Sequence, residues 1–174
     1  MDLFSIIVEM IDLRSFSNLW YWIALAVLWS SASHWVLGVP HDMILRAKRK
    51  PGQAEQDLQD AVRIQRNRIL FIHEVSGAFT TGFTFFIVTS LLLLGFVYDM
   101  EFAQAVSLMV VPMVGVGLIN LQTARRLAEQ EHDTDALCRR LMRTRTYIQM
   151  LGGVSIFVTG LWGMYQNMVI GALG

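Results

Sequence analysis

The sequence has little of the chemistry that usually identifies an enzyme. Its single cysteine, Cys138, excludes an internal disulfide and a CxxC dithiol site, and with them the small four-helix thiol oxidoreductases. Charged residues make up only 16% of the chain, against about 25% in soluble globular domains. The first ten residues lack the basic region and the cleavage site of a signal peptide, so we expect no segment to be removed. The 54% of hydrophobic residues indicates instead one membrane domain, residues 1–174.

Long apolar stretches predict four transmembrane helices. The first, residues 19–39, has 21 residues without Asp, Glu, Lys or Arg, and as a helix it would rise about 30 Å, the thickness of a hydrocarbon core. The other predicted spans are residues 69–97, 102–121 and 147–168. With charged helical segments at 41–68 and 123–146, they predict an all-α, integral membrane four-helix bundle with helical extensions.

The basic residues are confined to two loops and predict the orientation. Thirteen of the 14 Lys and Arg residues lie in residues 41–68 and 123–146. By the positive-inside rule both loops are cytoplasmic, which places both termini on the periplasmic side of a bacterial inner membrane. Acidic residues partly balance the charge of each loop. We therefore expect membrane lipid, and no nucleic acid, as the partner of these loops.

The first 14 residues predict a short amphipathic helix that lies in the membrane interface. Polar side chains at positions 2, 5, 9 and 12 recur at helical spacing, and apolar side chains take the opposite face. The polar face is acidic, so attraction to anionic lipid would not hold it. We expect residues 1–14 to pack on the neighbouring spans.

Small residues at helical spacing predict the faces on which the spans pack. In lipid such residues let helix backbones approach closely, and Ser and Thr bond across the contact. The predicted packing residues are Ala26, Ser30, Gly77, Thr80, Ser155, Thr159 and Gly163.

A layer of polar side chains near the cytoplasmic ends of the spans is a candidate site. His34 and His73 could ligate one b-type haem iron through their imidazole nitrogens, or share a divalent metal with Glu74. Asn120 and Gln149 complete this inner polar layer. No spacing motif such as HExxH is present, and an imidazole at this depth can also bond to water, a hydroxyl or a carbonyl. A packing role, a haem site and a metal or proton-relay site are therefore all open.

Three stretches resemble a family of uncharacterised alphaproteobacterial inner-membrane proteins. They are IDLRSFSNLWYWIALAVLWSSASHWVLGVPHDM, FVYDMEFAQAV and FVTGLWGMYQNM, and the resemblance covers most of the chain. Members often carry the label of a component of a Suf-type iron–sulfur assembly complex. Such machinery is cytoplasmic, and this chain has no cluster motif. The resemblance therefore implies the fold and the location, and no catalytic residue.

These observations predict a non-enzymatic integral inner-membrane accessory, assembly or scaffold protein. It would bind partner membrane subunits or self-associate, and it would carry no cofactor. The alternative is a membrane cytochrome with one haem b, or a metal-binding electron-transfer protein, that uses His34 and His73. A small oligomeric transporter or channel is the third possibility, because four spans are few for alternating access in a single copy.

Overall fold

The computed structural model describes residues 15–49, 52–129 and 133–171. The amphipathic helix predicted for residues 1–14 lies outside this part of the chain. The described residues confirm the all-α prediction and add one short hairpin. The elements are η1 (Ser15–Ser17), α2 (Leu19–His34), β1 (Trp35–Val36), β2 (Val39–Pro40), α3 (His41–Arg49), α4 (Gln53–Leu92), η2 (Leu93–Val97), α5 (Glu101–Ala128) and α6 (Thr134–Gly171).

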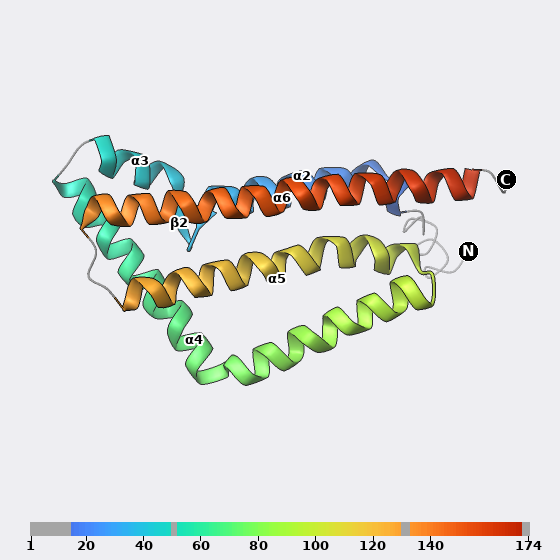
Figure 1. The fold of residues 1–174 in the computed structure, drawn as a ribbon, viewed down its shortest axis with the longest axis horizontal. Coiled ribbons are helices and arrows are strands. Elements are labelled where there is room, and N and C mark those ends of the chain that lie inside the picture. The colour runs from blue at the N-terminus through green and yellow to red at the C-terminus, as the bar shows by residue number, and fades with distance from the viewer. Residues whose placement is uncertain (1–14, 50–51, 130–132, 172–174) are drawn as a thin grey trace, which may run out of the picture.

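The long helices lie side by side (Figure 1). α5 lies between α4 and α6, and α2 packs on α6. At one end, which we call the basic end, α3 meets the start of α4, the end of α5 and the start of α6. At the opposite end η1, η2 and the start of α5 meet the last turns of α6. The first described residues and the end of α6 therefore lie together, away from the basic end.

Three helices in the described part of the chain are long and apolar enough to cross a membrane: Gln53–Val97, Glu101–Ala128 and Thr134–Val169. They contain the predicted spans 69–97, 102–121 and 147–168 and continue as helix into the charged segments before or after them. Between the first two, the chain reverses in a tight turn in which Asp99 has a φ of 52°. The length of these helices follows from uninterrupted apolar runs joined to good helix formers.

The helix predicted for residues 19–39 is shorter than expected. α2 has 16 residues and ends at His34, and an antiparallel hairpin follows in which Trp35 pairs with Pro40. The two central residues of this hairpin, Leu37 and Gly38, have φ angles of 55° and 76°, the left-handed backbone that tight hairpin turns need. The apolar run therefore ends in a chain reversal, and α2 alone rises about 24 Å.

The hairpin is the centre of the core at the basic end. Val36, Leu37 and Val39 are 0% exposed. They pack among apolar side chains of four helices, namely Ile44 and Ala47 of α3, Leu58 and Val62 of α4, Ala124 and Leu127 of α5, and Leu137, Cys138 and Leu141 of α6. A buried backbone group needs a partner, and the Leu37 N–H donates to Asn120 Oδ1 of α5 at 3.2 Å. The hairpin thus joins α3, α4, α5 and α6.

A second core joins α2 to α5 and α6, and it corrects the packing face predicted for α2. Leu25 and Trp29 of α2 are buried with Val116 and Ile148. The predicted residues Ala26 and Ser30 are exposed. α2 is apolar on all sides, so its sequence carries no periodicity that marks the buried face. The predicted residues of α6 do lie against neighbours: Ser155, Thr159 and Gly163 are all buried.

α4 bends near its midpoint (Figure 1). In that part of its sequence, Ser76 Oγ donates back to the Ile72 carbonyl at 2.9 Å, and Gly77 follows. Serine bonds of this kind and Ser/Gly pairs are common causes of helix bending. α4 diverges from α5 up to the bend, and beyond the bend it turns back toward α5 and meets it at the η2 turn (Figure 1).

Candidate functional site between α4 and α5

The residues of the predicted polar layer do not form one cluster. His34, Glu74 and Gln149 are exposed, and the ring of His34 contacts the edge of Trp35 at a centroid distance of 5.9 Å. The side chain of Asn120 accepts a hydrogen bond from the Leu37 N–H of the hairpin. Among the described residues no hydrogen bond or ion pair joins any two members of the layer. Each residue of the layer therefore has its own surroundings.

His73 is bonded to an arginine of α5. Its Nε2 lies 2.6 Å from Arg125 Nη2, and a guanidinium can only donate, so the imidazole accepts with a neutral nitrogen. On the other side of the ring, Nδ1 lies against Gly77, where an added Cβ would be 3.1 Å from it. Haem or metal ligation through Nε2 of His73 would first require Arg125 to leave.

A second arginine–histidine pair, which the sequence gave no reason to expect, joins α6 to the first residue of α3, directly after the hairpin. Arg145 Nη1 is 2.6 Å from His41 Nε2, and Arg145 Nε donates to the Ser33 carbonyl at 3.1 Å. His41 Nδ1 is buried and has no hydrogen-bond partner among the described residues. Burial, followed by the charges of Arg145 and His34, lowers the pKa of His41, and Asp42 opposes this shift. His41 is therefore held neutral at the joint between α2 and α3.

An open apolar groove with a volume of about 450 Å³ lies between α4 and α5. The α4 wall includes His73, Gly77, Thr80 and Thr84, of which Gly77 and Thr80 are predicted packing residues. Gly117 and Leu118 belong to the α5 wall, and a Cβ added to Gly117 would have nothing within 4 Å. Small residues therefore line much of the α4 wall, and Gly117 lies on the α5 wall, which otherwise carries Val and Leu.

A buried polar hub at the opposite end holds α5, α6 and η2 together. Gln104 is 1% exposed, and its Nε2 donates to the Gly95 carbonyl at 2.8 Å. Its Oε1 accepts from Trp162 Nε1 at 3.0 Å and from Gln166 Nε2 at 2.5 Å. The sequence signal was a glutamine between two alanines inside an apolar run, which marks a polar group that must find partners.

The described residues contain no group of three His, Cys, Asp or Glu side chains placed to hold a metal ion. Comparison with family models, curated proteins and solved structures finds no match to this chain. The resemblance to the alphaproteobacterial family therefore stays a prediction.

Proposed function

We propose that the chain is an integral membrane accessory or scaffold protein of a bacterial inner membrane, with its basic end in the cytoplasm. Three long apolar helices and the gathering of arginines at one end support this placement. α2, together with the hairpin that follows it, would make the fourth crossing, because residues 19–39 carry no Asp, Glu, Lys or Arg. The first described residues and the end of α6 would then lie on the periplasmic side.

The groove between α4 and α5 would be the docking site for a transmembrane helix of another protein chain. The observation that carries this proposal is the run of small residues on the α4 wall: Gly77, Thr80 and Thr84 line the same open space as Gly117 of α5. In lipid, helices associate by close packing over such residues, and threonine hydroxyls can bond across the contact. The same face predicted from the sequence would therefore serve a partner, either a second copy or another subunit.

The groove also differs from the rest of the apolar surface in its shape. In Gln53–Val97, only 6% of the most apolar stretch is buried within the chain, against 28% for the corresponding stretches of α5 and α6. That exposed surface carries large side chains such as Phe79 and Phe83, which suit lipid tails. A concave face with small side chains is better matched to the ridge of a helix.

Site-specific photo-crosslinking in cells tests this proposal. The native Cys138 is buried, so a cysteine introduced at an exposed position can be labelled selectively. Leu118→Cys, in the groove, and Val154→Cys, on α6 outside it, start from side chains that are 61% and 63% exposed. With a benzophenone on each, we expect a protein adduct from Leu118→Cys and none from Val154→Cys. Adducts of equal yield, or no protein adduct at either position, would contradict the proposal.

A groove-filling variant gives a second test that needs no label. Gly117→Leu puts a larger side chain into the groove, and Gly153→Leu makes the same change on α6; a Cβ added at either glycine has nothing within 4 Å. We expect Gly117→Leu to weaken association by at least about tenfold in mild detergent, since close approach of the partner is lost. Gly153→Leu should leave it unchanged. The mass of the crosslinked adduct then distinguishes a second copy of this chain from another subunit.

A further inference from the structure

Three arginines at the basic end line a cavity between α5 and α6. Arg126 of α5 and Arg140 and Arg143 of α6 surround a space of about 160 Å³. Gln122, Thr123, Thr144 and Tyr147 complete its polar lining. The cavity lies on the other side of α5 from the groove, and no residue lines both.

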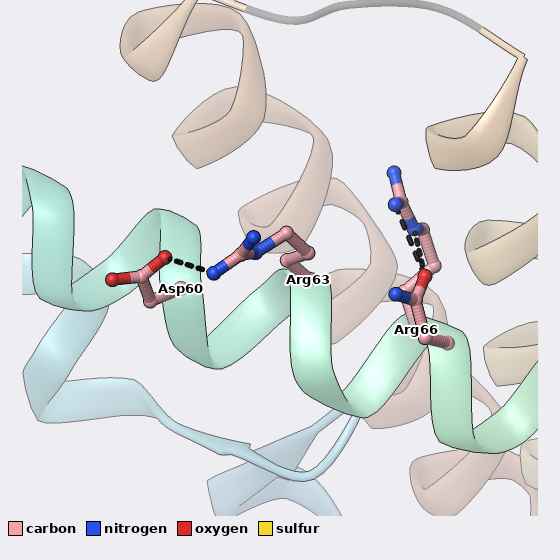
Figure 2. A network of polar contacts seen from close by, with 4 residues as sticks. Asp60, Arg63 and Arg66 are labelled. Carbon is pink, nitrogen blue, oxygen red and sulfur yellow. Dashed lines mark hydrogen bonds and ion pairs between the residues drawn. The ribbon is translucent and has the colours of Figure 1, made fainter.

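These arginines differ from those on α4 in what they contact. Figure 2 shows Arg63 paired with Asp60 at 2.8 Å, and Arg66 bonded to the neighbouring asparagine. Arg66 also donates to the Leu127 carbonyl at the end of α5. Among the described residues, by contrast, no side chain or carbonyl accepts a hydrogen bond from the guanidinium groups of the three cavity arginines, and no carboxylate forms an ion pair with them.

The walls of the cavity are held firmly. Thr123 and Thr144 are 6% and 3% exposed, and their Oγ1 atoms lie 3.1 Å apart where α5 crosses α6. Thr123 also contacts the Ile119 carbonyl at 2.8 Å, and Thr144 contacts the Arg140 carbonyl at 3.0 Å. The two hydroxyls have two hydrogens for these three contacts, so both hydrogens are used within the wall. The cavity is thus preformed.

We propose that this cavity binds the phosphate group of an anionic phospholipid. Three positive charges around one cavity repel each other, and a bound phosphate removes that repulsion while accepting forked hydrogen bonds from the guanidinium groups. The cavity lies where the apolar parts of α5 and α6 give way to charged residues, which is the depth of lipid headgroups in the membrane placement proposed above. Tyr147 at its rim is typical of that interface. The inference rests on this placement and is independent of the groove.

Native mass spectrometry of the detergent-purified protein tests the inference, with phosphatidylglycerol, phosphatidylcholine or inorganic phosphate added separately. We expect phosphatidylglycerol to be retained in preference to phosphatidylcholine. Replacing Arg126, Arg140 and Arg143 by Gln should weaken phosphatidylglycerol binding on the order of a hundredfold. Each of the three arginines contributes a comparable attraction to the anionic headgroup, and the three losses multiply. Inorganic phosphate should compete only weakly, because it has no acyl chains to bury.

The matched control removes the same number of positive charges elsewhere. Arg46→Gln, Arg63→Gln and Arg139→Gln together lie outside the cavity, and Arg46 and Arg63 already have acidic partners. This variant should bind phosphatidylglycerol as the wild type does. Equal losses in the two variants would mean diffuse attraction and would overturn the site, and binding of free phosphate as tight as that of the lipid would overturn the lipid assignment.

Two further variants keep the result decisive. Arg140→Lys retains the charge and removes the fork, so we expect a partial loss of binding in a protein that folds normally. Full retention of lipid by Arg140→Lys together with full retention by the triple Gln variant would overturn the inference. Gly117→Leu should bind lipid normally even though it loses association through the groove, so a failure of either proposal can be told from a failure of the other.

Discussion

Trp29 of α2 lies directly over Gly152 of α6. A Cβ added to Gly152 would come within 2.7 Å of the Trp29 ring, a distance that real side chains do not reach. Trp29 is 5% exposed, so its indole fills the space that the glycine leaves. At this contact, a large side chain of α2 therefore packs directly against the backbone of α6. The next residue of α6, Gly153, has open space around it.

We expect Gly152→Ala to lower the free energy of unfolding by about 1–3 kcal/mol, because the new methyl group overpacks the Trp29 ring. Gly153→Ala should have the opposite sign, a gain of up to about 1 kcal/mol, because alanine is the better helix former. Thermal unfolding of the two variants in the same detergent measures the difference. Equal effects would show that Trp29 does not lie on Gly152 in solution.

Gln104→Leu should lower the free energy of unfolding by about 1–3 kcal/mol, because one buried and two half-buried polar groups lose their partner. They are the Gly95 carbonyl and the side chains of Trp162 and Gln166. Gln149→Leu, the same change at an exposed position of α6, should stay within about 0.5 kcal/mol of the wild type. If the two variants unfold alike, the polar hub contributes nothing to stability.

The pair of His41 and Arg145 predicts a loss of stability in mild acid. The pKa of His41 lies below its ordinary value of 6.5, so the unfolded chain takes up a proton on this imidazole before the folded chain does. The free energy of unfolding should therefore fall as the pH is lowered through 6.5, and this group should have no effect above that range. His34, Asp42 and Arg145 are the charged or titratable groups that act on His41.

Thermal unfolding across this pH range, with wild type and His41→Gln compared, measures the effect. The variant should lose part of the pH dependence and keep a hydrogen-bond acceptor for Arg145. His34→Gln, at an exposed neighbour, should retain most of the wild-type dependence. An unchanged slope in His41→Gln would assign the acid sensitivity to another group.

We expect the protein purified from haem-supplied cells to show no Soret band and no sharp α-band after reduction with dithionite. The reason is that Nε2 of His73 accepts a hydrogen bond from Arg125, and no hydrogen bond links His73 to His34 in the described residues. An absorption spectrum with metal analysis on the same sample makes the measurement. A stoichiometric haem that disappears in His34→Ala or His73→Ala would instead support the electron-transfer alternative.

The sequence was most informative where one signal extended over many residues. Apolar runs predicted the long helices α4, α5 and α6, and the polar residues from Tyr98 to Glu101 marked the turn between the first two. The same signal was misleading at residues 35–39. An apolar run has the same composition in a helix and in a buried hairpin, and only Gly38 and Pro40 hinted at the reversal.

The contacts of single side chains could not be predicted from the sequence. A pattern of small residues does not say which helix of a pair supplies the small residue, and on α2 the buried residue is Trp29, with the glycine on α6. His41 and Arg145 are 104 residues apart, and His73 and Arg125 are 52 apart. Such pairs depend on how the helices are arranged, which no local periodicity encodes.

The buried hairpin has a consequence for the movement of solutes. Its tip closes the space between α4, α5 and α6 at the basic end with fully buried Val36, Leu37 and Val39. The Leu37 N–H cannot donate to a passing water molecule or anion, because it already donates to Asn120 Oδ1. In a single copy, the space between α4, α5 and α6 is therefore filled by the hairpin at the basic end. For a solute to pass, the hairpin would have to move out of this space, or the path would have to run between copies of the chain. A pore within one chain is therefore not expected.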